Sequence, residues 1–175
     1  MKKKTIEDLQ RISVETFKSM QKISLVVVLD NVRSLHNVGS VFRTSDAYLI
    51  EKIFLCGITA TPPLAEIHKT ALGAEDSVDW EYVENTCDVV ANLKKNDYTI
   101  FVIEQVENSI SLEEVELNKE RKYAVVLGNE VKGVQQAVVD ICDGCIELPQ
   151  FGTKHSLNVS VTAGIVIWDF FKQLY

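Results

Sequence analysis

Short, continuous apolar runs alternate with amphipathic stretches along most of the chain. Two such runs, at residues 25–29 and 123–127, are typical of strands that are buried on both faces of a parallel sheet. The stretches between the runs place apolar residues at the spacing of one helix face. The pattern predicts strands at 25–29, 53–56, 80–83, 99–103, 123–127 and 145–148, and helices at 38–48, 87–94, 134–141 and 157–174.

This alternation predicts a single α/β domain with a mostly parallel sheet and helices on both of its faces. The 175 residues suffice for one ordinary domain, and the hydrophobic share of 46% is enough to bury a core. Apolar residues between Ile6 and Phe17 recur at helical spacing and predict an N-terminal helix. We therefore expect residues 23–175 to form the main domain, and the helix within residues 1–22 to belong to the same unit.

Composition and charge exclude some classes of protein. No stretch reaches the roughly 20 apolar residues that span a bilayer, and no apolar run of a signal peptide follows the basic start. We therefore expect a cytoplasmic protein that does not enter a membrane. The net charge of −7 argues against coating of nucleic acid by bulk electrostatics, although a local basic surface is compatible with it.

The cysteines do not suggest a metal or redox centre. Cys142 and Cys145 form a C-x-x-C pair, but Cys56 and Cys87 lie far apart and provide no second ligand pair for zinc. A redox pair usually lies at the start of a helix, whereas a predicted strand continues after Cys145. We expect a structural role for the pair and no bound metal.

In parallel α/β sheets, ligands bind beyond the carboxyl ends of the strands. The polar, glycine-bearing segments that follow predicted strands are residues 30–43, 128–133 and 149–158. In the first, Asn37 is a plausible N-cap, and Asn37, Ser40 and Arg43 fall near one side of the following helix. Arg43 adjoins apolar residues, so it needs an acidic partner, a phosphate or backbone carbonyl groups. An ion pair on a surface helix is the alternative.

The other two segments leave alternatives open. Gly128 and Gly133 have the outer spacing of a P-loop, but no Lys-Ser/Thr follows. The segment is therefore either a plain tight turn or a place where a ligand approaches the backbone. The absence of G-x-G-x-x-G argues against a Rossmann dinucleotide site. In the third segment, Ser156 or a neighbour is expected to cap the last helix, which leaves Asn158 at an unfavourable interior position.

Together, the three segments resemble the motifs of the SpoU/TrmH family of RNA 2′-O-ribose methyltransferases, a branch of the SPOUT superfamily. The match includes Asn37 and Arg43, the run 127–130 followed by Gly133, and a nearly literal Ser-Leu-Asn-Val-Ser at 156–160. The resemblance implies a deep trefoil knot at the C-terminal end of the fold and a homodimer. It also implies transfer of a methyl group from S-adenosylmethionine to a ribose 2′-hydroxyl of tRNA or rRNA.

The resemblance further assigns roles to individual residues. The catalytic residues that it implies are Arg43, Asn37, Ser156 and Asn158. The donor contacts that it implies are Ile103, Glu104, Gly128, Asn129, Glu130, Gly133, Leu148, Gln150, Ser156 and Leu157. The backbone of Leu148 and Gln150 would meet the adenine edge. Many relatives have methionine at the position of Gln150, so this contact is expected to differ here.

The family assigns activation of the hydroxyl to Arg43, but a guanidinium with a pKa above about 12 is a poor base. A phosphate could orient Arg43, or Arg43 could stabilise the charge that develops on the alkoxide. Two alternative functions are a knotted RNA-binding module without catalysis and a non-enzymatic nucleotide-binding protein. The intact Arg43, Ser156 and Asn158 argue against the first, and the lack of a phosphate loop argues against the second.

The predicted closing helix is apolar on more than one side. Its apolar residues include Ile165, Val166, Ile167, Trp168, Phe170 and Phe171. A helix of this kind suits burial in both a core and a subunit interface. A core within one subunit also explains much of the pattern, so the residues alone leave the interface open.

Overall fold

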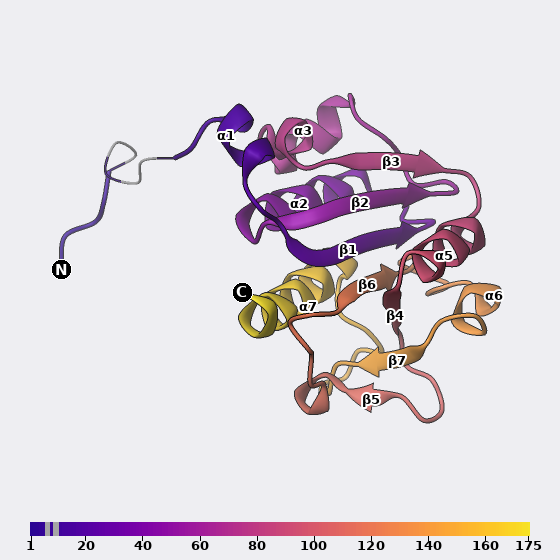
Figure 1. Ribbon diagram of the computed structural model, residues 1–175. Helices are drawn as coiled ribbons and strands as arrows, with labels where there is room; N and C mark the ends of the chain where they lie inside the picture. The colour runs from indigo at the N-terminus through magenta and orange to yellow at the C-terminus, as the bar shows by residue number, and fades with distance from the viewer. Residues whose placement is uncertain (6–7, 9–10) are drawn as a thin grey trace.

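Parallel strands form one seven-stranded sheet in the part of the chain that the computed structural model describes, residues 1–5, 8 and 11–175. The strand order is β3-β2-β1-β6-β4-β7-β5, and helices cover both faces (Figure 1). The strands are β1 Ile23–Asp30, β2 Ile50–Cys56, β3 Trp80–Val83, β4 Tyr98–Ile103, β5 Ile110–Ser111, β6 Lys122–Leu127 and β7 Gly144–Glu147. The helices are α1 Val14–Ser19, α2 Leu35–Ala47, α3 Ala65–Ala71, α4 Ala74–Ser77, α5 Thr86–Lys95, α6 Gln136–Val139 and α7 Val159–Leu174, with a 3₁₀ turn at Leu112–Glu114.

The sheet confirms the predicted α/β class. Each strand that the apolar runs predicted is present, and its neighbours run parallel to it. The sequence did not indicate β5, which has 2 residues, or α4, which has 4. Elements of this length show too little of either periodicity to be recognised. None of the helices in the described residues combines the length and apolar character that crossing a membrane requires.

Alternating side chains of the central strands divide the interior into two cores. Leu25, Val27 and Leu29 of β1 pack with α1, α2 and α7 on one face. Val26 and Val28 pack with α5 and α6 on the other. Successive strand residues point to opposite faces, and helices cover both faces of this strand. The run 25–29 is therefore apolar throughout rather than alternating.

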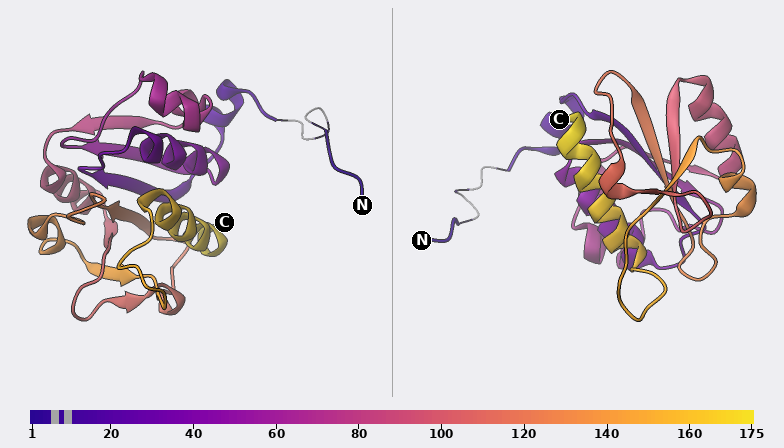
Figure 2. Two further views of the ribbon diagram at one scale, coloured as in Figure 1. Left: turned by 180° about the vertical axis from the view of Figure 1, so that it is seen from behind. Right: turned by 90° about the horizontal axis from the view of Figure 1, so that it is seen from below.

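The final helix, α7, closes the first core against the sheet (Figures 1 and 2). Its residue Phe170 is fully buried. The ring of Phe170 meets those of Phe101 and Tyr123 edge-on, with centroids 6.4 and 6.1 Å away. This geometry is favourable for aromatic pairs. It anchors the helix to β4 and β6, the strands whose ends lead into the candidate site.

Two helix starts differ from the predictions because other side chains take the capping role. Ser34, not Asn37, caps α2, and its side chain accepts a hydrogen bond from the Asn37 N–H. Asn158, not Ser156, caps α7, and its side chain accepts hydrogen bonds from the backbone of Ser160 and Val161. Asn158 therefore occupies a favoured cap position rather than the helix interior.

Helix α6 is shorter than the predicted segment 134–141: Gln135, with ψ of 135°, is its N-cap, and carboxylates accept hydrogen bonds from the backbone N–H groups that precede the helix. The N–H of Val134 donates to Glu104, and that of Gln135 donates to Asp30. Helix α3 begins at Ala65, after an N-cap at Leu64.

The predicted N-terminal helix is present only in its last part. Helix α1 begins at Val14, because Ser13 caps it by accepting a hydrogen bond from the Thr16 N–H. Ile12 precedes the cap and is exposed, whereas Phe17 is buried in the first core. The prediction was therefore wrong for Ile12. Positions 6, 7, 9 and 10, with Ile6 and Leu9, lie outside the described residues.

A buried carboxylate lies at the carboxyl end of β1. Asp30 is fully buried. Its Oδ1 accepts hydrogen bonds from the hydroxyl of Thr86 at 2.6 Å and from the side chains of Asn31 at 2.9 Å and Gln135 at 2.7 Å. Its Oδ2 accepts from the Gln135 N–H at 2.9 Å. The carboxylate thereby joins β1, the start of α5 and the loop after β6.

We predict that Asp30→Ala lowers the free energy of unfolding by roughly 2–5 kcal/mol, because buried donors would lose their acceptor. The exposed Asp88→Ala on α5 is the control. It should cost at most about 1 kcal/mol, through its place in the first turn of the helix. Urea unfolding followed by circular dichroism measures both. Equal losses in the two variants would contradict a special role for the buried carboxylate.

Candidate functional site

The carboxyl ends of β4, β6 and β7 open into a cavity of about 670 Å³. This volume lies within the range of about 300–1,000 Å³ that is usual for sites of small ligands. Its walls come from residues 103–106, 127–134, 146–148, 150 and 155–159, with a few side chains from α6 and α7. The site therefore assembles from segments that are far apart in the sequence, at the sheet edge where a parallel α/β fold was expected to bind its ligand.

The sequence-predicted donor residues all line this one cavity. They are Ile103, Glu104, Gly128, Asn129, Glu130, Gly133, Leu148, Gln150, Ser156 and Leu157. Asn158, predicted to be catalytic, lines it as well. Asn37 and Arg43 on α2 are not part of the lining. The structure thus brings the predicted donor set together, while contact of these residues with a donor stays a prediction.

The loop after β6 needs its glycines for its own packing. Backbone hydrogen bonds of 3.0 and 2.9 Å join Asn129 and Gly133 and close the loop. A Cβ on Gly128 would collide with the backbone of Val134. Gly133 has φ of 67°, which favours glycine, and a Cβ there would collide with the carboxylate of Glu104. The segment is therefore a tight turn that also forms a wall of the cavity.

Glu130 fastens this turn to the start of α2. Its carboxylate accepts hydrogen bonds of 2.9 Å from the N–H groups of Arg33 and Ser34, and one of 3.0 Å from the side chain of Asn37. The Asn37 side chain in turn accepts a hydrogen bond of 3.1 Å from Asn158. One chain of hydrogen bonds therefore connects all three motif segments.

The hydrogen bonds to Glu130 also set its protonation. Partial burial by itself would raise the pKa of the carboxyl group. The N–H groups of Arg33 and Ser34, together with the Asn37 side chain, stabilise the carboxylate and hold its pKa below the ordinary value of 4.5. The group is thus a carboxylate at neutral pH, which is the form that accepts from all three donors.

Comparison with known proteins agrees with this arrangement. The model of the SpoU rRNA Methylase family matches residues 24–168. The chain belongs to this family. A 23S rRNA (guanosine-2′-O-)-methyltransferase, RlmB, from Nitrosomonas europaea is 32% identical over 169 residues. The match covers 97% of the chain but only 61% of that relative, so the chain spans about three fifths of its length.

Two matches from Aquifex aeolicus, one by sequence and one by structure, extend the comparison. A tRNA (guanosine(18)-2′-O)-methyltransferase is 31% identical over 160 residues, which cover 91% of the chain and 74% of the relative. The crystal structure of the A. aeolicus TrmH/SpoU tRNA modifying enzyme matches with a TM-score of 0.79 at 29% identity, over 91% of the chain and 79% of that protein. The fold of this SpoU family member is therefore the fold of a solved relative.

The structure places Arg43 differently from what its apolar neighbours in the sequence suggested. Val41 and Phe42 point into the core, whereas Arg43 is exposed. Within the described ranges its guanidinium forms neither a hydrogen bond nor an ion pair. The expectation of an apolar setting was therefore wrong, and of the expected partners neither an acidic side chain nor a backbone carbonyl group binds the guanidinium in these ranges. The helix turns Arg43 outward, so its apolar neighbours do not enclose it.

Sequence reasoning missed the residue that secures the loop before α7. Gln105 follows Glu104 at the end of β4, lines the cavity and donates from its side chain to the carbonyl of His155 at 3.0 Å. The only sequence signal was its position directly after a predicted strand and beside Glu104. Its partner lies 50 residues later in the chain, so no local pattern indicates the pair.

The C-x-x-C pair packs beside the cavity as thiols. Burial raises the pKa of Cys142 to about 12, and the thiol of Cys145 donates to the carbonyl of Glu104 at 3.2 Å. A raised pKa disfavours the thiolate that reaction or metal binding requires. In the part of the chain that the structure describes, no three histidine, cysteine or carboxylate side chains are grouped so as to hold a metal ion.

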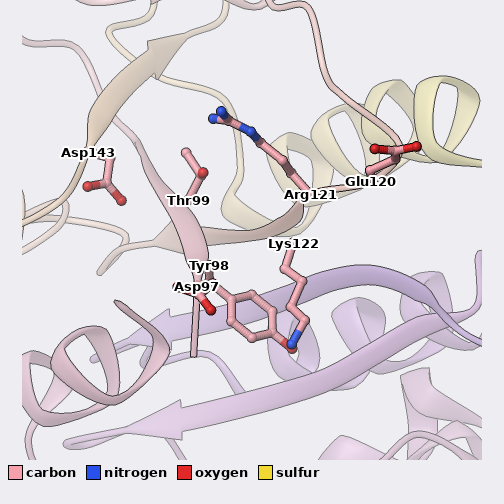
Figure 3. A pocket seen from close by; sticks show the side chains of 7 residues that line it. All are labelled: Asp97, Tyr98, Thr99, Glu120, Arg121, Lys122 and Asp143. Carbon is pink, nitrogen blue, oxygen red and sulfur yellow. The ribbon is translucent and has the colours of Figure 1, made fainter. Parts of the chain in front are cut away.

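A second cavity, of about 540 Å³, lies at the opposite edge of the sheet, by the amino ends of β4 and β6 (Figure 3). Its lining mixes Arg121 and Lys122 with carboxylates, and the two basic side chains point apart. Asp143 is already engaged by Lys94 at 2.9 Å. None of the three motif segments contributes to this cavity, so the carboxyl edge is the candidate site.

We predict that Glu130→Gln removes a pH-dependent part of the stability. The folded pKa of Glu130 lies below 4.5, so its contribution is fully present above the unfolded value and is lost as the pH falls through the folded value. The stability difference between wild type and variant should therefore be constant near neutral pH and shrink below about pH 4.5.

Urea unfolding between about pH 7 and about pH 3 measures this difference. The exposed Glu113→Gln in the 3₁₀ turn is the matched control and should give no such trend. A difference for Glu130→Gln that stays flat over the whole range would show that the hydrogen bonds do not favour the ionised carboxylate.

Proposed function

We propose that the protein transfers a methyl group from S-adenosylmethionine to a ribose 2′-hydroxyl of tRNA or rRNA in the cytoplasm. The observation that carries the proposal is the single cavity lined by every residue that the family pattern assigns to the donor. Membership of the SpoU family supports it. The names of the relatives RlmB and the A. aeolicus tRNA methyltransferase agree on 2′-O-methylation and differ in the RNA.

The cavity suits an adenosine-containing donor. Ile103, Ile146 and Leu148 provide apolar walls for a flat base. The backbone of Gln150 forms no hydrogen bond with the rest of the described chain, so its N–H and C=O groups are available to a polar edge. The bound donor would supply a reactive methyl group. The protein's task is then to hold the two reactants in line and to manage the hydroxyl proton.

Asn37 and Asn158 act on this chemistry as positioning residues. The Asn158 amide donates to Asn37, and its oxygen accepts from the N–H and the hydroxyl of Ser160. These bonds leave Asn158 little capacity for a ribose. We assign to the pair the alignment of α2 with α7. Ser156 lines the cavity with an exposed side chain and is free to contact the ribose.

We assign to Arg43 the stabilisation of the negative charge that develops on the reacting hydroxyl. Its guanidinium stays protonated at neutral pH and is a poor base. An exposed guanidinium on α2, without a protein partner in the described ranges, can meet RNA and stabilise the developing alkoxide. A phosphate of the same RNA could orient it. The RNA substrate would thus supply the anionic partners of Arg43.

We also propose that the C-terminal segments form the deep trefoil knot of the family. The hydrogen bond of Glu130 with Arg33 joins the loops after β6 and β1, and that of Gln105 with His155 joins the loop after β4 to the loop before α7. The segments expected to form the knot are thus bonded in pairs, which supports the proposal. We propose residues 23–175 as the methyltransferase domain, with residues 1–22 as part of the same unit. Burial of Phe17 in the first core supports this boundary.

We further propose a homodimer formed through the outer face of α7. Val161, Ile165 and Trp168 follow one another at the spacing of one helix face and are 50%, 41% and 47% exposed. An apolar stripe of this kind on a monomer is typical of a surface that a partner covers. A second copy would cover the stripe and bring two sites together.

We predict that Arg43→Ala lowers the rate of methyl transfer by at least about 100-fold, because charge on the alkoxide would lose its stabilising group. Donor affinity should not change, since Arg43 is not part of the cavity lining. The assay uses labelled S-adenosylmethionine and total RNA from the host, followed by mapping of the labelled nucleotides. Arg121→Ala, at the opposite edge of the sheet, is the matched control and should retain activity.

The outcomes separate the candidate functions. Ribose label with wild type, and little with Arg43→Ala, supports the methyltransferase. Tight donor binding without transfer to any RNA would point to a missing partner protein or an absent substrate. Neither donor binding nor transfer would refute the enzyme and favour an RNA-binding module without catalysis.

We predict that Trp168→Glu shifts the protein from dimer to monomer, because a buried, unpaired charge is costly in an apolar interface. Sedimentation velocity measures the change. Ile110→Glu on β5 is the control, because Ile110 is 43% exposed and lies on an edge strand of the sheet rather than on α7. A dimer that persists in Trp168→Glu would exclude this face of α7 as the interface.

A further inference from the structure

The loop between β7 and α7 presents an almost completely exposed aromatic ring. Phe151 is 97% exposed, and every residue from 151 to 158 is exposed. The other phenylalanines of the chain are buried or partly buried. Single exposed apolar residues are common on protein surfaces, so exposure alone assigns no role. The position of this ring relative to the cavity is what distinguishes it.

Phe151 stands at the rim of the donor cavity. Its neighbour Gln150 lines the cavity, and so does His155 on the far side of the same loop, whereas Phe151 itself does not. The loop projects beyond the body of the molecule in the right-hand view of Figure 2. The Gln105 side chain binds the carbonyl of His155 in this loop, and the Asn158 side chain, at the end of the loop, binds Asn37 on α2. The loop that carries the ring is therefore fastened beside the cavity, while Phe151 is not part of the cavity wall.

Three exposed basic residues lie in segments that line or adjoin the same opening. Lys132 lines the cavity and is exposed, and Lys154 is exposed on the Phe151 loop. Arg33 is also exposed, and its backbone is bonded to the cavity residue Glu130. None of these cations pairs with a carboxylate in the described part of the chain. Glu104 and Glu130 nearby already accept backbone N–H groups.

We propose that Phe151 stacks on an unpaired nucleobase of the RNA substrate, beside the nucleotide whose ribose enters the cavity, while Arg33, Lys132 and Lys154 contact the flanking phosphates. An exposed ring within a group of unpaired cations is the combination that binds single-stranded nucleic acid. This inference rests on the proposed function and narrows its substrate to RNA that is unpaired at the target.

The chemistry favours RNA over a second copy of the chain at this position. A base in a duplex is stacked on its neighbours and cannot cover a protein ring, whereas bases in loops can turn outward. A subunit interface is usually depleted of lysine at its centre. The stripe on α7 consists of the apolar residues Val161, Ile165 and Trp168, so it suits the second copy better.

The test compares Phe151→Ala, Phe151→Trp and the control Ile58→Ala in the methyl-transfer assay. Ile58 is 65% exposed on a loop at the same edge of the sheet but outside the cavity lining. Phe151→Ala should raise the KM for RNA roughly ten-fold, since loss of one stacked base has an effect of this order. The Kd for S-adenosylmethionine should stay unchanged, and Phe151→Trp should restore the KM for RNA.

A second readout does not require turnover. In Phe151→Trp, single-stranded RNA should quench tryptophan emission beyond the quenching seen with wild type, and fully paired RNA should not. This readout separates the proposed RNA contact of residue 151 from the proposed methyl-transfer reaction. If wild type transfers no methyl group but the Trp variant shows this quenching, the proposed reaction fails and the RNA surface stands.

Four results would overturn the inference. The first is an unchanged KM for RNA in Phe151→Ala while wild type is active. The second is equal quenching by paired and unpaired RNA, and the third is no quenching by either. The fourth is conversion of Phe151→Ala from dimer to monomer in sedimentation velocity, which would show that the ring belongs to a subunit interface.

Discussion

The candidate site depends on one constraint, which is that the backbone N–H groups of loops at the end of a parallel sheet need acceptors. Carboxylates meet this need. Glu130 binds the N–H groups that precede α2, Glu104 binds that of Val134, and Asp30 binds that of Gln135. Each carboxylate lies on a different segment from its donor. The loops are thereby fastened to one another, and the cavity takes its shape from these bonds.

The sheet was largely predictable because its signal is local. A run such as 25–29 is apolar throughout, since helices cover both faces of β1. Helix starts were less predictable, because they depend on tertiary hydrogen bonds. Nothing near Val134 indicates that Glu104 and Asp30 will bind the N–H groups that precede α6. The cap of α2 moved to Ser34 for a similar reason, since Asn37 is engaged by Glu130.

The residues of the cavity could be predicted because the family motifs are contiguous stretches whose order and spacing can be recognised in the sequence. What the motifs could not show is how these residues contact one another. The bond between Asn37 and Asn158 spans 121 positions, and that between Gln105 and His155 spans 50. The outward direction of Arg43 was also hidden, because its apolar neighbours suggested an enclosed setting that the turn of the helix removes. No sequence pattern indicated a role for Phe151, since its proposed role depends on its exposure in the folded protein.

The close approach of Gly133 to Glu104 links the evolutionary histories of two positions. A side chain at 133 would enter the space of the Glu104 carboxylate, and the φ of 67° already disfavours most residues there. Replacement of Gly133 would therefore require the Glu104 carboxylate to move or residue 104 to become smaller, and either change gives up the bond to Val134. The order of substitutions matters, so the two positions should vary together among homologues rather than independently.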